Sequence, residues 1–157
     1  MTQKSTKDRP KIALFEPDIP QNTAAIMRTC ACLGAKLEII EPCGFLINDK
    51  RFKRIVMDYM DKKEIRYYQS YDHFFKEKKS QRIILMTTKA SVPYTNFNFD
   101  KNDTILFGRE SAGVPQTVHK MINHRLKIPM KNNKRSLNIA SSVAIILAEC
   151  LKQTKLI

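Results

Sequence analysis

Short catalytic signatures and long apolar runs are largely missing from this sequence. Only four of the 157 residues are glycine, and neither G-x-G-x-x-G nor G-x-x-x-x-G-K-[ST] occurs. The usual dinucleotide-binding and P-loop sites are therefore excluded. There is also no H-E-x-x-H motif and no recognisable Ser-His-Asp set. No apolar run reaches the length of a membrane span, so we expect no association with a membrane.

Cysteine and histidine are too sparse and too scattered to indicate a metal site. The four cysteines form no C-x-x-C pair, and the three histidines do not lie at zinc-ligand spacing from them. Cys30 and Cys150 fall within apolar helical patterns and are expected in the core. We predict neither a disulfide nor a metal.

The length and composition fit one globular domain. A chain of 157 residues, 43% of them hydrophobic, can bury a single core. The segment from Met1 to Pro10 is polar and basic and lacks the apolar stretch of a secretory signal. We therefore expect a flexible basic tail at residues 1–10, a single domain at residues 11–157, and a cytoplasmic location.

The charge balance is strongly positive. Lys and Arg number 28 against 15 Asp and Glu, which gives a formal net charge of +13. A surface of this kind is typical of a protein with a polyanionic partner, such as RNA, DNA or an anionic membrane. The alternative is compositional, because the sequence is rich in the Lys, Asn and Ile that an AT-rich genome favours.

Apolar runs typical of strands alternate with helical patterns along the chain. Their order predicts an α/β fold with a mostly parallel sheet and helices on both faces. The expected strands are Lys11–Phe15, Lys36–Glu41, Glu64–Gln69, Arg82–Thr87, Thr104–Phe107 and Arg125–Met130. The expected helices are Pro20–Leu33, Asp49–Val56, Tyr71–Lys79, Gln116–Ile122 and Leu137–Thr154. The longest irregular stretch is Ser91–Asp103.

Two of these helices carry unusual side-chain patterns. On a helical wheel of Pro20–Leu33, Arg28 projects from the edge of the apolar stripe, where a solvated surface arginine is the ordinary interpretation. The segment from Ile139 to Leu151 is apolar or small on nearly every face, with Glu149 as its only charge. Such a helix has to be covered on all sides, either by a second subunit or within the monomer.

A glycine-bracketed segment follows one of the predicted strands. Two of the four glycines fall in Phe107–Pro115, which reads FGRESAGVP. Parallel sheets bind ligands at the carboxyl ends of their strands, against loops of this kind. Glu110 and Ser111 are therefore candidate ligand-site residues, although an ordinary strand-to-helix turn would use the same glycines.

A second loop leads from a strand into the apolar last helix. Ile128–Ala140 reads IPMKNNKRSLNIA. Ser136 or Asn138 is placed to cap the helix, whose free N–H groups also form a ready ligand site. Three basic side chains in this loop suit phosphate and are candidates for RNA binding: Lys131, Lys134 and Arg135.

Taken in register, three segments resemble the SpoU family of the SPOUT methyltransferases. The first contains Asn22 and Arg28 within EPDIPQNTAAIMRTC, the second is FGRESAGVP, and the third is IPMKNNKRSLNIASSVAIILAE. Each alone is weakly specific, but their order and spacing match over nearly the whole chain from Lys11. The small size and the segments Glu41–Phe45 and Met57–Tyr59 are most similar to members that methylate the wobble nucleotide of tRNA.

The resemblance implies a deep C-terminal trefoil knot, which nothing else in the sequence suggests because knots are so rare. It also implies a homodimer with the active site at the subunit interface, which would cover the last helix. S-adenosylmethionine is the implied methyl donor, and a ribose 2′-OH of tRNA is the implied acceptor. By position in the motifs, the cofactor-binding residues are Met86, Thr87, Gly108, Ile128 and Ser136.

The resemblance places the catalytic group at Arg28. A guanidinium is nearly always protonated, so we expect Arg28 to clamp a phosphate beside the target ribose rather than to act as a base. Asn22, Glu110 and Asn138 are the polar candidates for supporting this site. Ala148 replaces a tyrosine common in the family. The alternatives are the same chemistry on ribosomal RNA or at another tRNA position, and a non-catalytic RNA-binding protein on the same scaffold.

Overall fold

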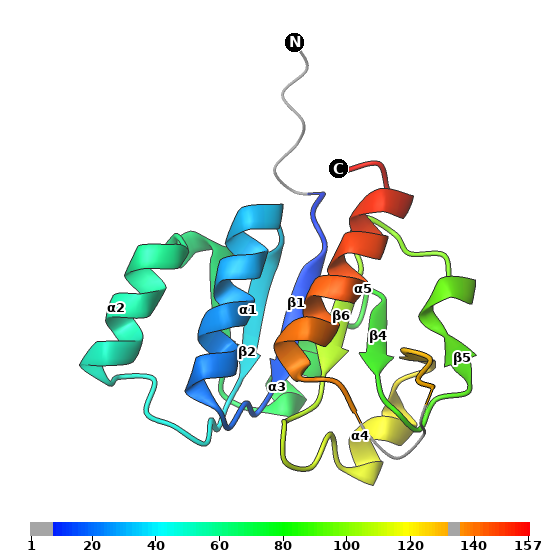
Figure 1. Cartoon of the computed structure of the whole chain (residues 1–157). Coiled ribbons are helices and arrows are strands. Elements are labelled where there is room, and N and C mark those ends of the chain that lie inside the picture. Colours follow the sequence, from blue (N-terminus) through cyan, green and yellow to red (C-terminus); the bar gives the residue numbers. More distant parts are fainter. Residues whose placement is uncertain (1–7, 132–135) are drawn as a thin grey trace.

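The computed structural model describes residues 8–131 and 136–157 and places seven strands in one sheet (Figure 1). The strand order is β3-β2-β1-β6-β4-β7-β5, and all neighbouring strands in it are parallel. The predicted α/β class and parallel sheet are confirmed. The strands are β1 (Lys11–Phe15), β2 (Lys36–Ile40), β3 (Ile65–Tyr68), β4 (Ile83–Met86), β5 (Val92–Pro93), β6 (Thr104–Phe107) and β7 (His124–Lys127).

Alternate residues of the central strands face two different hydrophobic cores. Ile12 and Leu14 of β1 belong to the first core, whereas Ala13 and Phe15 belong to the second. Both faces of the strand are therefore buried, which is why its sequence reads as a continuous apolar run. Burial on both sides requires helices on both faces of the sheet.

Three helices cover the first core and two cover the second. The first group is α1, α2 and α5, and α1 packs against both of the others; Figure 1 shows α1 and α5 side by side in front of the sheet. The second group is α3 and α4. The helices are α1 (Pro20–Leu33), α2 (Lys50–Tyr59), α3 (Tyr71–Glu77), α4 (Gln116–Met121) and α5 (Ile139–Gln153), with short 3-10 turns at Lys62–Glu64 and Tyr94–Asn96.

The helix ends follow local signals in the sequence. Pro20 stands in the first turn of α1, and Gly34 ends that helix in the left-handed conformation with a φ of 80°. Asp49 caps α2 and Asn138 caps α5, each by accepting backbone N–H groups of the first turn. Of the two candidate caps predicted for the last helix, Asn138 is the one that the structure uses.

Strand boundaries differ from expectation where pairing stops. β7 ends at Lys127 and not at the predicted Met130, because its neighbours β4 and β5 end at Met86 and Pro93. β5 itself falls within Ser91–Asp103, which the sequence predicted to be irregular. Two residues are too few to produce a periodic signal.

The end of the predicted tail is attached to the domain. Arg9 pairs with Glu64 at 3.0 Å and donates a hydrogen bond of 3.2 Å to the carbonyl of Gly34. Pro10 is buried. Residues 1–7, the rest of this predicted tail, lie outside the described residues. Among the helices of the described chain, none combines the length and the apolar character needed to cross a bilayer.

The single chain covers α5 only in part. Ile146 and Cys150 are fully buried, as are the other α5 residues on the side that faces the sheet. On the opposite side, Ile145 is 37% exposed and Ala148 is also exposed. The expected burial of Cys30 and Cys150 is confirmed, whereas an apolar strip of α5 stays open to solvent.

Candidate functional site

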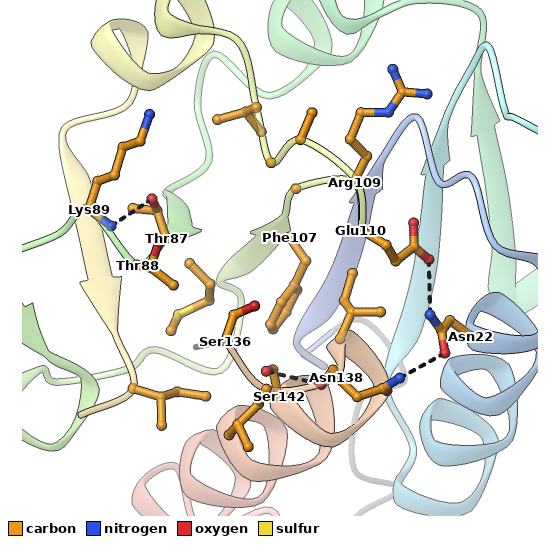
Figure 2. A pocket seen from close by; sticks show the side chains of 18 of the residues that line it. Asn22, Thr87, Thr88, Lys89, Phe107, Arg109, Glu110, Ser136, Asn138 and Ser142 are labelled. Atoms are coloured by element: carbon orange, nitrogen blue, oxygen red, sulfur yellow. Dashed lines mark hydrogen bonds between the residues drawn. The ribbon is translucent and has the colours of Figure 1, made fainter. Parts of the chain in front are cut away.

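A cavity of about 500 Å³ lies at the carboxyl ends of β4 and β6, against the N-terminus of α5 (Figure 2). Ligands of parallel sheets bind at this edge, and the volume is typical of a small-molecule site. The cavity is lined by Ile19, Asn22, Met86, Thr87, Thr88, Lys89, Phe107, Gly108, Arg109, Glu110, Ala112, Gly113, Val114, His119, Ile128, Met130, Ser136, Leu137, Asn138, Ile139 and Ser142.

The structure brings together the residues assigned to the cofactor. They come from the ends of β4 and β6, from the chain that follows β7, and from the residues just before α5. All five line the cavity: Met86, Thr87, Gly108, Ile128 and Ser136. These five residues are far apart in the sequence, and the order of the strands in the sheet brings them together.

The backbone geometry of the loop after β6 explains why glycine occupies two of its positions. A Cβ at Gly108 would stand 2.6 Å from the backbone of Gly113, so any larger residue would push the loop open. Gly113 has a φ of 65°, a conformation that side chains disfavour. Arg109 and Gly113 exchange backbone hydrogen bonds of 3.1 and 2.8 Å, which close this turn against the cavity.

A chain of hydrogen bonds joins three predicted polar residues at the cavity wall (Figure 2). Asn138 Nδ2 donates to Asn22 Oδ1 at 3.2 Å, and Asn22 Nδ2 donates to Glu110 Oε1 at 3.5 Å. Asn138 Oδ1 accepts the N–H of Ala140 at 2.9 Å, which fixes the orientation of its amide. The chain links α1, the loop after β6 and the N-terminus of α5, and it ends on the Glu110 carboxyl group.

Asp18, which the sequence analysis did not single out, holds the other side of Glu110. Its backbone N–H donates to Glu110 Oε2 at 3.1 Å. Its carboxylate accepts the Ser111 hydroxyl and lies 3.7 Å from Arg109 Nε. Ser111, a predicted ligand-site residue, therefore supports Asp18 instead of lining the cavity. The position of Asp18 just before the helix that carries Asn22 was the available signal.

The two acidic side chains of this pair titrate differently. Burial is the largest cause that raises the pKa of Glu110, and although the backbone N–H of Asp18 lowers this pKa, a side-chain hydrogen bond with Asp18 raises it further. The same shared hydrogen bond is the largest cause that lowers the pKa of Asp18, followed by the hydrogen bond from Ser111. These opposite directions favour the proton on Glu110 and the negative charge on Asp18, whose carboxylate lies next to Arg109.

Arg28 does not line the cavity of its own chain. It is exposed on α1, with its guanidinium carbon 5.5 Å from the centre of the Tyr59 ring. Asn22, at the N-terminal end of the same helix, does line the cavity. Within one chain the structure therefore groups Asn22, Glu110 and Asn138, and it leaves Arg28 more than a helical turn away.

Of the three residues predicted to bind RNA, the structure describes one. Lys131 is exposed, and the residue before it, Met130, lines the cavity. Lys134 and Arg135 lie outside the described residues. Among the described residues, no group of His, Cys, Asp and Glu is arranged to hold a metal ion.

Three basic side chains of the cavity were not singled out by the sequence analysis: Lys89, Arg109 and His119. Lys89 lies three residues after the end of β4 and Arg109 lies within FGRESAGVP, so their positions after strand ends were an available signal; His119 on α4 gave none. Arg125 Nη1 lies 3.0 Å from His119 Nδ1. Burial, followed by the charges of Arg125 and Lys89, lowers the pKa of His119, which favours the neutral imidazole.

Comparison with known proteins agrees with this geometry. Residues 9–148 match the model of the SpoU rRNA Methylase family. A tRNA (cytidine(34)-2′-O)-methyltransferase of Beijerinckia indica subsp. indica is 45% identical over 144 residues, which cover 90% of each chain. A solved structure described as giving insights into the 2-OH methylation of C/U34 on tRNA superposes with a TM-score of 0.84 at 32% identity, covering 94% of this chain and 97% of that one.

More distant structures share the architecture. The SpoU methyltransferase AviRb from Streptomyces viridochromogenes, solved in complex with AdoMet, has a TM-score of 0.80 at 19% identity, covering 94% of this chain and 58% of that one. That degree of identity shows a common fold alone. The family model, by contrast, spans most of the sequence with its motifs in place, and the chain belongs to the SpoU rRNA Methylase family.

Proposed function

We propose that this protein transfers a methyl group from S-adenosylmethionine to the ribose 2′-OH of the wobble nucleotide, position 34, of a tRNA. The observation that carries the proposal is the meeting of three motif segments around one cavity at the carboxyl edge of the sheet. The 45% identity to the Beijerinckia enzyme supports the choice of nucleotide. A protein with this substrate acts in the cytoplasm.

The cavity fits the proposed cofactor. Its volume of about 500 Å³ suits a ligand of nucleoside size. Phe107, Ile128 and Ile139 offer an apolar wall, while the hydroxyl groups of Thr87 and Ser136 offer hydrogen-bonding partners. When bound, the cofactor supplies an electrophilic methyl group on a sulfonium, and these residues hold and orient it.

The polar wall of the cavity would position the acceptor. Attack of a hydroxyl on a methyl group requires the two to be in line, so alignment is the main contribution that side chains can make. Because Asn138 and Asn22 are each fixed by a hydrogen bond, they present preorganised polar groups. The hydroxyl also loses a proton, and the charge of Arg28 would stabilise the oxygen while it holds the neighbouring phosphate.

We further propose that the protein is a homodimer in which Arg28 serves the cavity of the partner subunit. Arg28 is exposed and lies outside the cavity of its own chain, so it needs another copy to reach one. The exposed strip of α5 at Ile145 and Ala148 supports the same arrangement, because an open apolar strip on a helix is typical of a subunit interface.

The C-terminal knot of the family is also part of the proposal. The support for it is that β7 pairs with β4 and β5, whereas α5, which follows β7 in the chain, packs against α1. Gln153 of α5 ties the loop between β4 and β6 to the helix by bonding to the backbone of Phe97 and Phe99 at 3.0 and 2.8 Å. A crystal structure that traced residues 132–135 outside the loop would contradict the knot.

Ribosomal RNA is a second candidate substrate. The observation in its favour is that the matching family is described as one of rRNA methylases. The test is mass spectrometry of nucleosides from tRNA and ribosomal RNA that have been incubated with the protein and labelled S-adenosylmethionine. Labelled 2′-O-methylcytidine or 2′-O-methyluridine at position 34 is the expected result. Label in ribosomal RNA alone, or at another tRNA position, would favour the second substrate. Tight tRNA binding with no label would favour a non-catalytic RNA-binding protein.

A further inference from the structure

Helix α2 carries a basic surface that the cavity does not use. Four cationic side chains near its start are exposed: Lys50, Arg51, Lys53 and Arg54. Within the described part of the chain, none of the four lies within 4.0 Å of a carboxylate oxygen. Some other cations of the molecule are paired, as Arg82 is with Asp103 at 2.6 Å. The charge on α2 is therefore available to a partner.

The packing of α2 explains why these cations point outward. Phe52 and Val56 lie one turn apart and are buried in the first core. On a helical wheel, the side opposite to them carries Lys50, Arg51 and Arg54 together with Met57, which is 71% exposed, and one acidic residue, Asp58; Lys53 projects from the flank. Asp49 accepts two backbone N–H groups as the helix cap, so its carboxylate is already occupied.

Arg28 lies on the helix next to this basic surface. α2 packs against α1, and Figure 1 shows it at the edge of the molecule beside that helix. Tyr59 at the end of α2 is 40% exposed, and the guanidinium of Arg28 lies 5.5 Å from the centre of its ring. A polyanion bound to α2 would therefore lie on the helix next to the one that carries the arginine assigned to the target phosphate.

We propose that the exposed side of α2 is a docking surface for the RNA backbone, in which Lys50, Arg51, Lys53 and Arg54 bind phosphates. This inference rests on the proposed function, which supplies the RNA substrate. It adds a contact on a different element from the loop that contains Lys131. Clustered cations without carboxylate partners bind phosphates with release of counterions, and such contacts need no particular base.

An anionic membrane fits this helix less well than RNA does. A helix that binds a membrane surface inserts its apolar side between the lipids. The apolar side of α2 is already packed on the core through Phe52 and Val56, so it has none left to insert.

The experiment compares two pairs of neutral substitutions. Lys53→Gln/Arg54→Gln removes two charges from α2, and Lys76→Gln/Lys79→Gln removes two exposed charges from the α3 region, which lies on the other face of the sheet. The measurements are the Kd for tRNA as a function of KCl, the Kd for S-adenosylmethionine, and single-turnover methylation at saturating tRNA.

We expect the α2 variant to bind tRNA about tenfold more weakly at moderate salt. The slope of log affinity against log salt should fall by about 1 to 2, because each lost phosphate contact removes roughly 0.7–0.9 from it. Cofactor affinity and the rate at saturating tRNA should not change. The Lys76→Gln/Lys79→Gln protein should resemble the wild type in all three measurements.

Two results would overturn the docking surface while leaving the proposed function in place. In the first, the wild type methylates tRNA but the α2 variant keeps the wild-type affinity and salt slope. In the second, the α2 variant and the Lys76→Gln/Lys79→Gln protein lose affinity for tRNA equally. Failure of the wild-type protein to bind or methylate any tRNA would instead refute the proposed function, and the docking surface with it.

Discussion

Asn138 and Asn22 face each other across the cavity wall, with Asn138 Nδ2 donating to Asn22 Oδ1 at 3.2 Å. The first residue caps α5 and the second lies in the first turn of α1. One side chain therefore both begins the last helix and sets the position of a residue on the first. This double role allows the two effects to be separated by substitution.

Replacing Asn138 with aspartate should separate capping from positioning. The Asn138→Asp side chain would keep an acceptor for the N–H of Ala140, but a carboxylate cannot donate to Asn22. We expect nearly wild-type stability and a single-turnover methylation rate lower by about 10²-fold, the scale of a small misplacement at a reacting centre. Asn138→Ala should lose the activity and also about 1 kcal/mol of stability, because it loses the cap. Wild-type turnover by the aspartate variant would remove Asn138 from the site.

Arg28→Ala should leave the fold and cofactor affinity unchanged, because the side chain is exposed and lies outside the cavity. Methyl transfer should nonetheless fall by roughly 10²–10³-fold, the effect of losing one electrostatic stabiliser. Arg28→Lys keeps the charge and loses the planar fork, so little rescue is expected if the group clamps a phosphate in two places. The measurement is single-turnover methylation at saturating cofactor, with a thermal melt to confirm folding.

The subunit that Arg28 serves can be tested by mixing variants. Arg28→Ala and Asn138→Ala chains should each be inactive, but a mixed dimer has one cavity with both groups intact if Arg28 acts on the partner. Recovery of activity on mixing is therefore expected. If mixing restores nothing although the dimers exchange, Arg28 serves its own chain or neither one.

Two adjacent isoleucines of α5 distinguish an interface from a core. Ile145 is 37% exposed in the single chain, whereas Ile146 is fully buried. Ile145→Asp should therefore fold and shift the protein from dimer to monomer, as measured by light scattering. Ile146→Asp should fail to fold, because it buries an unpaired charge in the core. A wild-type protein that is monomeric at tens of micromolar would contradict the dimer.

The acid pair predicts a particular pH dependence of stability. The pKa of Glu110 is raised above its ordinary value of 4.5, so its contribution to stability is present at low pH and is lost as pH rises through the raised pKa. Glu110→Gln mimics the protonated carboxyl group, so the variant should not lose this stabilising contribution as pH rises. Its free energy of unfolding, relative to wild type, should therefore increase as pH rises from about 4.5 toward neutrality. Urea unfolding between these limits is the measurement, and a difference independent of pH would contradict the assignment.

Asp18 should show the opposite dependence. Its pKa is lowered from 3.8, so its stabilising contribution is present above that value and is lost as pH falls through the lowered pKa. Asp18→Asn should lack this acid-sensitive contribution, and the difference from wild type should shrink as the solution is made more acidic. A loss of stability that stays constant with pH would show that packing, and not charge, is the role of Asp18.

The sequence by itself determined the features that depend on local patterns. The apolar runs predicted the strands because both faces of a parallel strand are buried, and Pro20 and Gly34 marked the limits of α1 because their backbone preferences act locally. The resemblance to the SpoU family assigned Met86 and Gly108 to the cofactor, and the structure places both residues at the cavity. Such positions can be read without knowing what lies next to them in space.

Only the tertiary structure decided what depends on the meeting of distant segments. Asp18 holds Glu110 across 92 positions of sequence, and no local pattern reports that contact. The two-residue strand β5 exists because β7 offers it an edge to pair with. Packing of α1 against α2 likewise placed Arg28 beside Tyr59 and away from its own cavity, where the spacing from Asn22 had suggested a shared site. These outcomes follow from the strand order and from helix packing, which the whole chain sets together.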